Sequence, residues 1–127
     1  MSAVLKPEVR LEPLTEALLD DVLRIENSAY AHPWTRGNFA DSLASGYDAW
    51  ILSRNGEAVG YAVVMNVLDE AHLLDIAVTL EAQGGGLATR FLDWLAETAR
   101  ARGARDFYLE VRPSNTAALR LYARGGF

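Results

Sequence analysis

The segment Leu73–Arg102 constrains the fold most, because an apolar run, a glycine loop and an amphipathic helix follow one another there. Leu73–Val78 is apolar except at Asp75, and three consecutive glycines stand at 84–86. From Leu87 onward, apolar residues recur at every fourth position, which is helical spacing. The segment therefore predicts a buried strand, a loop and a helix, which is a building block of α/β folds.

This order of elements also predicts an anion site. The first backbone N–H groups of a helix have no partner within it, and the helix dipole adds partial positive charge at the same end. Glycines lack the Cβ atoms that would hold a phosphate away from those N–H groups. We therefore expect a phosphate group at the helix start near Gly86, although the residues alone also allow a glycine-rich turn without a ligand.

The loop motif narrows the kind of phosphate. No Gly-Lys-Ser/Thr follows, which excludes a Walker A loop, and no G-x-G-x-x-G dinucleotide fingerprint is present. The pattern Gln83-x-x-Gly86-x-Ala88 resembles the Q/R-x-x-G-x-G/A signature of the GNAT family of N-acetyltransferases. In that family, the loop binds the pyrophosphate of acetyl-CoA.

Composition limits the class of protein. A chain of 127 residues suffices for one domain, and 50% hydrophobic with 23% charged residues is usual for a soluble protein. No apolar run approaches the ~20 residues of a membrane span, and the first residues lack the apolar segment of a signal peptide. The absence of cysteine excludes disulfides, thiolate metal sites and a cysteine nucleophile. We expect a cytoplasmic protein with no membrane contact.

Charge indicates the partner. The net charge of −5 argues against nucleic-acid binding and favours a basic partner. His32 and His72 have no companion at metal-ligand spacing, so we expect no metal. Nothing in the sequence specifies the oligomeric state.

The remaining patterns predict the other elements. A strand at 9–11 is followed by a helix capped by Thr15 and a helix capped by Thr35. The first of these helices has an apolar face of Leu18, Val22, Ile25 and Ala29, and its other faces carry Asp20, Asp21, Arg24 and Glu26. Strands follow at 49–54, 58–67, 71–78 and 106–111, of which the first two are joined by Asn55-Gly56, and a helix follows at 116–124.

These elements predict a mixed, mostly antiparallel sheet flanked by helices. The helix between the strands at 71–78 and 106–111 requires a right-handed crossover, which makes these two strands parallel. We expect one domain over residues 1–127, with an absent C-terminal hairpin because the chain stops at Phe127 where another strand would start.

The resemblance to the GNAT family extends beyond the loop. The segments HPWT, LDEAHLLDIAV and LEVRPSNTAALRLYARGGF occur in this order, and together they are similar to the subgroup that acetylates the N-terminal alanine of bacterial ribosomal proteins. The resemblance implies the GNAT fold, in which the fourth and fifth strands splay apart, and it implies acetyl-CoA as co-substrate. It also implies a protein N-terminus, that of a basic ribosomal protein, as acceptor.

The resemblance implies which residues contact acetyl-CoA. They are backbone groups of Ile76, Ala77 and Val78, the loop and helix start formed by Gln83, Gly84, Gly85, Gly86, Leu87, Ala88 and Thr89, and Asn115. The N–H of Val78 would polarise the thioester carbonyl. Gly84 and Gly85 depart from the family pattern, which usually carries arginines there.

Acetyl transfer to an amine needs a base, an oxyanion donor and an acid. The resemblance gives Glu110 the base role and Tyr122 the role of protonating the departing thiolate. From the residues alone, Glu110 could also be a solvent-facing strand residue, and Tyr122 could be a core residue on the face shared with Ala118 and Leu119.

Three residues are candidates for the acceptor side. Trp34 and Tyr30 could either pack in the core or form a wall of the substrate groove, and Asp75 could be a sheet residue or line that groove. Asp69 and Glu70 could cap a turn or attract a basic peptide. Two other functions stay open at this point, an acetyltransferase for a small amine or antibiotic and a non-catalytic CoA-binding module.

Overall fold

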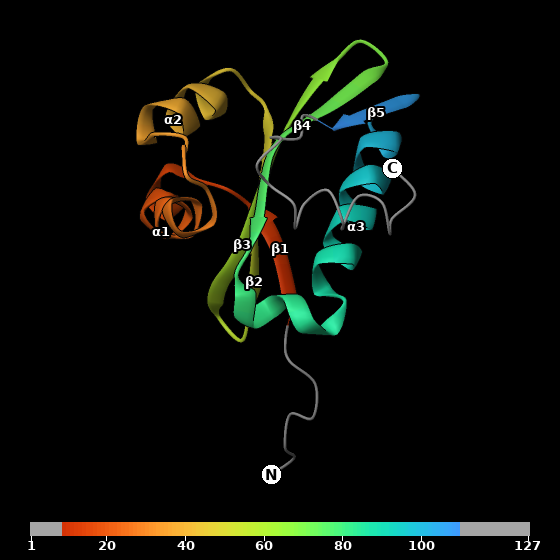
Figure 1. Ribbon diagram of the computed structural model, residues 1–127. Helices are drawn as coiled ribbons and strands as arrows, with labels where there is room; N and C mark the ends of the chain where they lie inside the picture. The colour runs from red at the N-terminus through yellow and green to blue at the C-terminus, as the bar shows by residue number, and fades with distance from the viewer. Residues whose placement is uncertain (1–8, 110–127) are drawn as a thin grey trace.

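The computed structural model describes residues 9–109 (Figure 1). The elements are β1 (Val9–Pro13), the 3₁₀ turn η1 (Glu16–Leu18), α1 (Leu19–Ala29), α2 (Arg36–Ala44), β2 (Asp48–Arg54), β3 (Glu57–Val67), β4 (Glu70–Val78), the 3₁₀ segment η2 (Leu80–Gly85), α3 (Leu87–Ala101) and β5 (Asp106–Leu109). The predicted helix at 116–124 and the predicted C-terminal hairpin lie outside these residues.

The five strands form one sheet in the order β1-β2-β3-β4-β5. The first three pairings are antiparallel and the β4–β5 pairing is parallel. The predicted mixed, mostly antiparallel sheet is therefore confirmed. The one parallel pair is the one that a helix connects, as the right-handed crossover requires.

Short turns hold the antiparallel strands in register. Asn55 and Gly56 have φ of 54° and 82°, the left-handed pair that a two-residue hairpin favours. At the other end of β3, Leu68 takes a φ of 55° in the turn to β4, with 97% of its surface exposed.

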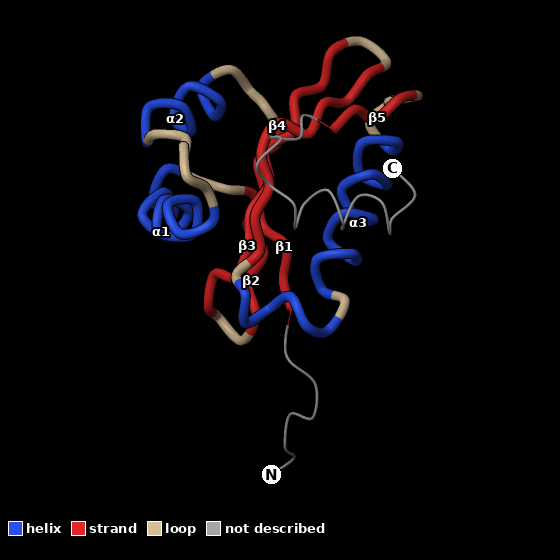
Figure 2. Tube along the Cα trace, viewed as in Figure 1, coloured by secondary structure: helices blue, strands red, loops and turns tan. Residues whose placement is uncertain are grey.

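Helices cover both faces of the sheet. In Figures 1 and 2, α1 and α2 lie against one face and α3 lies against the other. On the α3 side, Phe91, Leu92 and Leu95 pack with Leu73 and Ile76. On the α1 side, Val22, Ile25 and Phe39 pack with Tyr61 and Val63. Two cores therefore fix the sheet from opposite sides.

The first helix corrects two predictions. Thr15 makes no side-chain cap hydrogen bond, because the chain first forms η1 and the α-helix begins at Leu19. This start turns Leu19, Val22, Ile25 and Glu26 inward, while Ala29 is exposed. The expectation that Glu26 lies on an outer face was wrong, because positions 22, 25 and 26 share one face of a helix.

The second helix begins as predicted. Thr35 accepts a hydrogen bond from the backbone N–H of Asn38 (3.2 Å), and the Asn38 side chain accepts one from the Thr35 N–H (2.8 Å), which completes a capping box. Between residues 9 and 109, no helix is both long and apolar enough to cross a membrane.

Candidate functional site

The C-terminal half of β4 has an open edge. The β4–β5 ladder pairs Glu70–Leu73 with Asp106–Leu109. Leu74–Val78 therefore has β3 on one side and no paired strand on the other among the residues that the structure describes. The predicted splay between the fourth and fifth strands would begin beyond this last described pair, Leu73 and Leu109.

Backbone hydrogen bonding shows which groups face that edge. The Thr79 N–H donates to the Val59 carbonyl (2.8 Å), so Thr79 turns its polar groups toward β3. Successive residues of an antiparallel strand alternate in direction, so Ala77 also faces β3. Ile76 and Val78 consequently direct their N–H and carbonyl groups to the open edge.

Two side chains hydrogen-bond to the carbonyls on this edge. The Tyr30 hydroxyl at the end of α1 donates to the Ile76 carbonyl, and Gln83 Nε2 donates to the Val78 carbonyl (2.8 Å). Both residues were predicted to belong to the site, and both contact β4 directly. The open edge of β4 therefore presents backbone donors and acceptors, and two of its carbonyls accept hydrogen bonds from side chains.

The start of α3 supplies the second part of the site. Gly86 is the N-cap with a φ of 76°, a left-handed conformation that favours glycine, and its carbonyl accepts from the Arg90 N–H (3.0 Å). The N–H groups of Leu87, Ala88 and Thr89 precede that first intrahelical bond and point out of the helix end. No side chain caps this end, so it can receive an anion.

A cavity of about 760 Å³ joins the open edge of β4 to the start of α3. The predicted residues that line it are Tyr30, Ile76, Ala77, Val78, Gln83, Gly86, Ala88 and Thr89. Arg24, Arg54, Glu57 and Glu81 also line it and were not predicted. One volume therefore contacts most of the sequence-derived cofactor residues.

Other predicted residues lie elsewhere. The Leu87 side chain is buried in the core on the α3 side, so only its backbone can serve an anion. Trp34 packs on Phe39 with ring centroids 5.2 Å apart and does not line the cavity. Asp75 is 4% exposed within β4, and Gly84 and Gly85 lie in η2.

A buried polar cluster beside the cavity was missed. Glu26 is fully buried; one carboxylate oxygen accepts from the Tyr61 hydroxyl and the other from the Trp34 N–H (2.9 Å). Burial raises the pKa of Tyr61 well above its usual range, and the nearby carboxylates of Asp75 and Glu26 raise it further. Glu26 thereby fixes the backbone of the α1–α2 loop against the sheet. The helical spacing of Val22 and Glu26 could have revealed it.

The start of β4 carries exposed acidic residues. The Asp69 carbonyl accepts from the Arg105 N–H (2.7 Å), and Glu70 Oε1 lies 3.1 Å from His72 Nε2. His72 stacks on Tyr108 with centroids 5.0 Å apart. Asp106 and then Glu70 raise the pKa of Tyr108. Asp69 therefore ties the turn to β5, while the carboxylates leave this corner negative.

Three predicted residues, Glu110, Asn115 and Tyr122, lie outside the described residues, and their roles stay predictions. Glu110 directly follows Leu109, which pairs with Leu73 at the last position of the β4–β5 ladder. Within residues 9–109, no three His, Asp or Glu side chains are grouped so that they could hold a metal ion.

Known proteins resemble this chain in sequence and in structure. The model of the acetyltransferase (GNAT) family matches residues 19–127. The [ribosomal protein bS18]-alanine N-acetyltransferase of Escherichia coli K12 is 40% identical over 103 residues, which cover 81% of this chain and 70% of that protein. The enzyme of the same name from Haemophilus ducreyi is 32% identical over 117 residues, covering 92% and 81%.

A solved structure shows the same arrangement of elements. The crystal structure of the ribosomal-protein-S18-alanine N-acetyltransferase from Escherichia coli matches with a TM-score of 0.83 and 35% identity. The match covers 94% of this chain and 77% of that one. The likeness therefore extends over nearly the whole chain.

Proposed function

This chain belongs to the acetyltransferase (GNAT) family, and we propose that it transfers the acetyl group of acetyl-CoA to the N-terminal alanine of ribosomal protein bS18. The family makes it an acetyl-CoA-dependent N-acetyltransferase. The acceptor is the proposal, and it rests on the relatives of 40% and 32% identity that carry that activity in their names.

The observation that carries the proposal is the cavity between the open edge of β4 and the start of α3. A pantetheine arm contains amide groups at intervals, so it can pair with a strand edge as an added strand would. Ile76 and Val78 supply that edge, and the N–H groups of Leu87, Ala88 and Thr89 receive the pyrophosphate. The site thus matches two adjoining parts of one ligand, the pantetheine arm and the pyrophosphate.

Binding has a local consequence at β4. The Gln83 side chain donates a hydrogen bond to the Val78 carbonyl. A pantetheine arm that hydrogen-bonds to this carbonyl would replace Gln83 and release its amide. Gln83 then lies beside the pyrophosphate-binding helix start as a neutral donor. The Val78 N–H polarises the thioester carbonyl and stabilises the oxyanion that forms on attack.

The chemistry is a direct transfer. The acceptor nitrogen attacks the thioester carbon, the C–N bond forms, and the C–S bond breaks with its electron pair on sulfur. Glu110 takes the proton that the amine loses, directly or through water, and Tyr122 donates a proton to the thiolate. Because an N-terminal amine has a pKa of about 7.7 to 8, a base matters most below that pH.

The acceptor would reach the reaction centre past Tyr30, whose loop Glu26 fixes to the sheet. A basic protein N-terminus fits the net charge of −5. The cytoplasm stays the predicted compartment.

The test compares three acceptor substrates, two peptides and one small amine. One carries the first residues of bS18 from the same organism, the second is the same peptide blocked at its α-amine but with free lysines, and the third is a small amine such as an aminoglycoside. We expect thiol release and a mass gain of one acetyl group with the first substrate alone. Equal rates with the blocked peptide or the aminoglycoside would refute the N-terminal alanine as the preferred acceptor. No turnover with any amine would indicate a CoA-binding module without catalysis.

A further inference from the structure

The loop that binds phosphate in this chain has no cation of its own. Residues 83–86 read Gln-Gly-Gly-Gly, so the turn before α3 offers only neutral side chains and backbone. The first helical turn adds N–H groups but no cationic side chain to the cavity wall. The CoA moiety bears a pyrophosphate and a 3′-phosphomonoester, and such groups are bound most tightly by arginine.

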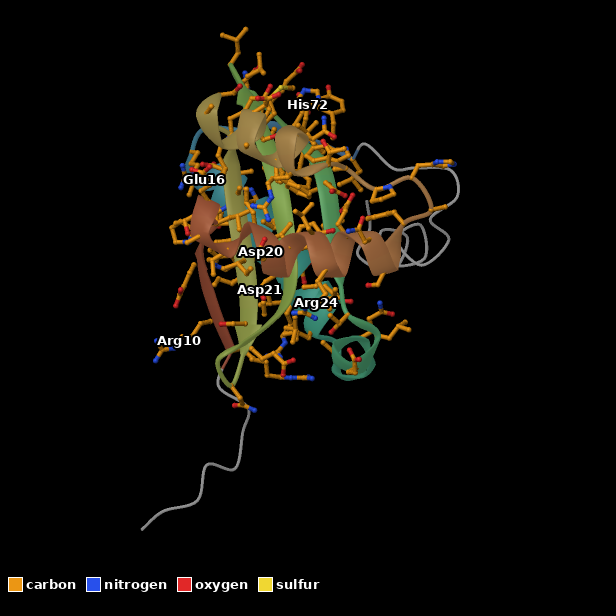
Figure 3. The ribbon with its side chains drawn as sticks, turned by 90° about the vertical axis from the view of Figure 1, so that its left-hand side faces the viewer. Arg10, Glu16, Asp20, Asp21, Arg24 and His72 are labelled. Atoms are coloured by element: carbon orange, nitrogen blue, oxygen red, sulfur yellow. The ribbon has the colours of Figure 1, made fainter. Side chains whose placement is uncertain are left out.

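Two arginines reach the same cavity from distant parts of the chain. Arg24 lies in α1, and Arg54 is the last residue of β2. Among the described residues, no other basic side chain lines the cavity. In Figure 3, Arg24 lies on the side of α1 toward the η2–α3 connection. The fold therefore brings cations to the phosphate end by tertiary packing.

Both guanidinium groups are available. Arg54 is half-buried, and among residues 9–109 its guanidinium has no hydrogen bond or ion pair. Arg24 has a long contact of 3.7 Å to Asp21, with both side chains about half exposed. An exposed pair of this kind is worth little, so turning Arg24 to an anion costs little.

Three other arginines do not line this cavity. Arg36 is paired with Asp20, and Arg102 binds Asp48 (3.0 Å) and lies over the Trp50 ring. Arg90 in α3 is exposed and does not line the cavity. The cavity wall also carries Glu57 and Glu81, whose charge repels phosphate and favours a pose centred on the arginines.

We propose that Arg24 and Arg54 form a cationic clamp for the phosphate groups of the CoA moiety, in place of cations in the loop. The inference rests on the proposed use of acetyl-CoA and names the residues that would set its affinity. The arginines are binding residues, so they should alter cofactor affinity and leave the rate at saturating cofactor unchanged.

The experiment measures dissociation constants of CoA, dephospho-CoA and pantetheine by calorimetry in the full chain. We expect Arg24→Ala and Arg54→Ala each to weaken CoA binding about tenfold, the usual worth of a charged hydrogen bond, with pantetheine binding unchanged. A loss confined to CoA assigns the clamp to the 3′-phosphate. A loss shared by dephospho-CoA assigns it to the pyrophosphate.

Matched variants separate the possible failures. Arg100→Ala removes one exposed cation from the last turn of α3 and should leave CoA binding unchanged, and Arg54→Lys should restore part of the loss. If the Arg24→Ala and Arg54→Ala variants bind CoA as the wild type does, or lose pantetheine equally, the clamp is refuted. If the wild type binds no CoA at all, the proposed function fails first.

Discussion

The two faces of the sheet are built differently. Among residues 9–109, the core on the α3 side consists of hydrophobic residues, and none of the three buried polar residues lies in α3. The α1 side contains Tyr61 and the buried carboxylate of Glu26, with Asp75 close enough to affect the pKa of Tyr61. A buried charge is costly unless it is hydrogen-bonded, so its partners must be kept in place. The α3 face thus supplies stability, while the α1 face fixes the loop beside the site.

The largest effect is expected on the apolar face. Phe91 in α3 is 1% exposed, so Phe91→Ala should lower the free energy of unfolding by about 3–5 kcal/mol through lost burial and a cavity. Phe91→Leu should lose much less. Urea unfolding with an unchanged slope measures both. A loss below about 1 kcal/mol for Phe91→Ala would mean that α3 does not hold the sheet.

On the α1 side of the sheet, the free energy of unfolding should depend more on lost hydrogen bonds than on lost side-chain volume. Glu26→Ala leaves the Tyr61 hydroxyl and the Trp34 N–H without their acceptor, which should lower the free energy of unfolding by about 2–3 kcal/mol. The double variant Glu26→Leu/Tyr61→Phe should recover part of that loss, because it removes the stranded hydroxyl as well. If the double variant is as unstable as the sum of its single changes, the pair is not coupled.

Gly60 in β3 tests how closely β3 approaches β4. A Cβ on Gly60 would lie 2.9 Å from the Ala77 carbonyl oxygen and 3.2 Å from Val78 Cγ2. Gly60→Ala should therefore cost about 1–3 kcal/mol and weaken acetyl-CoA binding by displacing β4. Gly37→Ala in α2, where the nearest atom lies at 3.6 Å, should instead stabilise by up to ~1 kcal/mol. Thermal denaturation with and without acetyl-CoA measures the stability and the cofactor binding of the two variants. Equal changes in melting temperature would contradict the close contact between Gly60 and the Ala77 carbonyl.

The smallest expected effect is an alkaline one on the α1 face. The pKa of Tyr61 is raised in the folded state by burial, so its contribution is intact below the unfolded pKa of about 10. Above that pH the unfolded state loses the proton first, and stability falls by about 1.4 kcal/mol per unit. Tyr61→Phe should be less sensitive between pH 10 and 11, as urea midpoints at the two pH values would show. An identical pH dependence in the two proteins would mean that Tyr61 ionises when folded.

The sequence predicted the parts that depend on local patterns. The Asn55-Gly56 pair located the β2–β3 hairpin of the meander, and the glycine loop located the start of α3 near Gly86. The inward position of Glu26 was missed although Val22, Ile25 and Glu26 share one face of α1, because a carboxylate on a helix usually faces solvent. No local pattern could pair Arg24 with Arg54, since only tertiary packing brings α1 and the β2–β3 hairpin to one cavity.

The unequal connections between strands bear on the order in which the sheet assembles. β2, β3 and β4 are joined by tight turns, whereas β4 and β5 meet only after residues 79–105 have closed as a loop through α3. Closing a longer loop costs more chain entropy, so we expect the meander to form early and β5 to dock late. Native-state hydrogen exchange should show β5 amides opening at lower free energy than those of β3. The β4 edge that we propose as the acetyl-CoA site then lies between the early and the late parts of the chain, so a ligand bound there would stabilise the docking of β5 as well as serve the reaction.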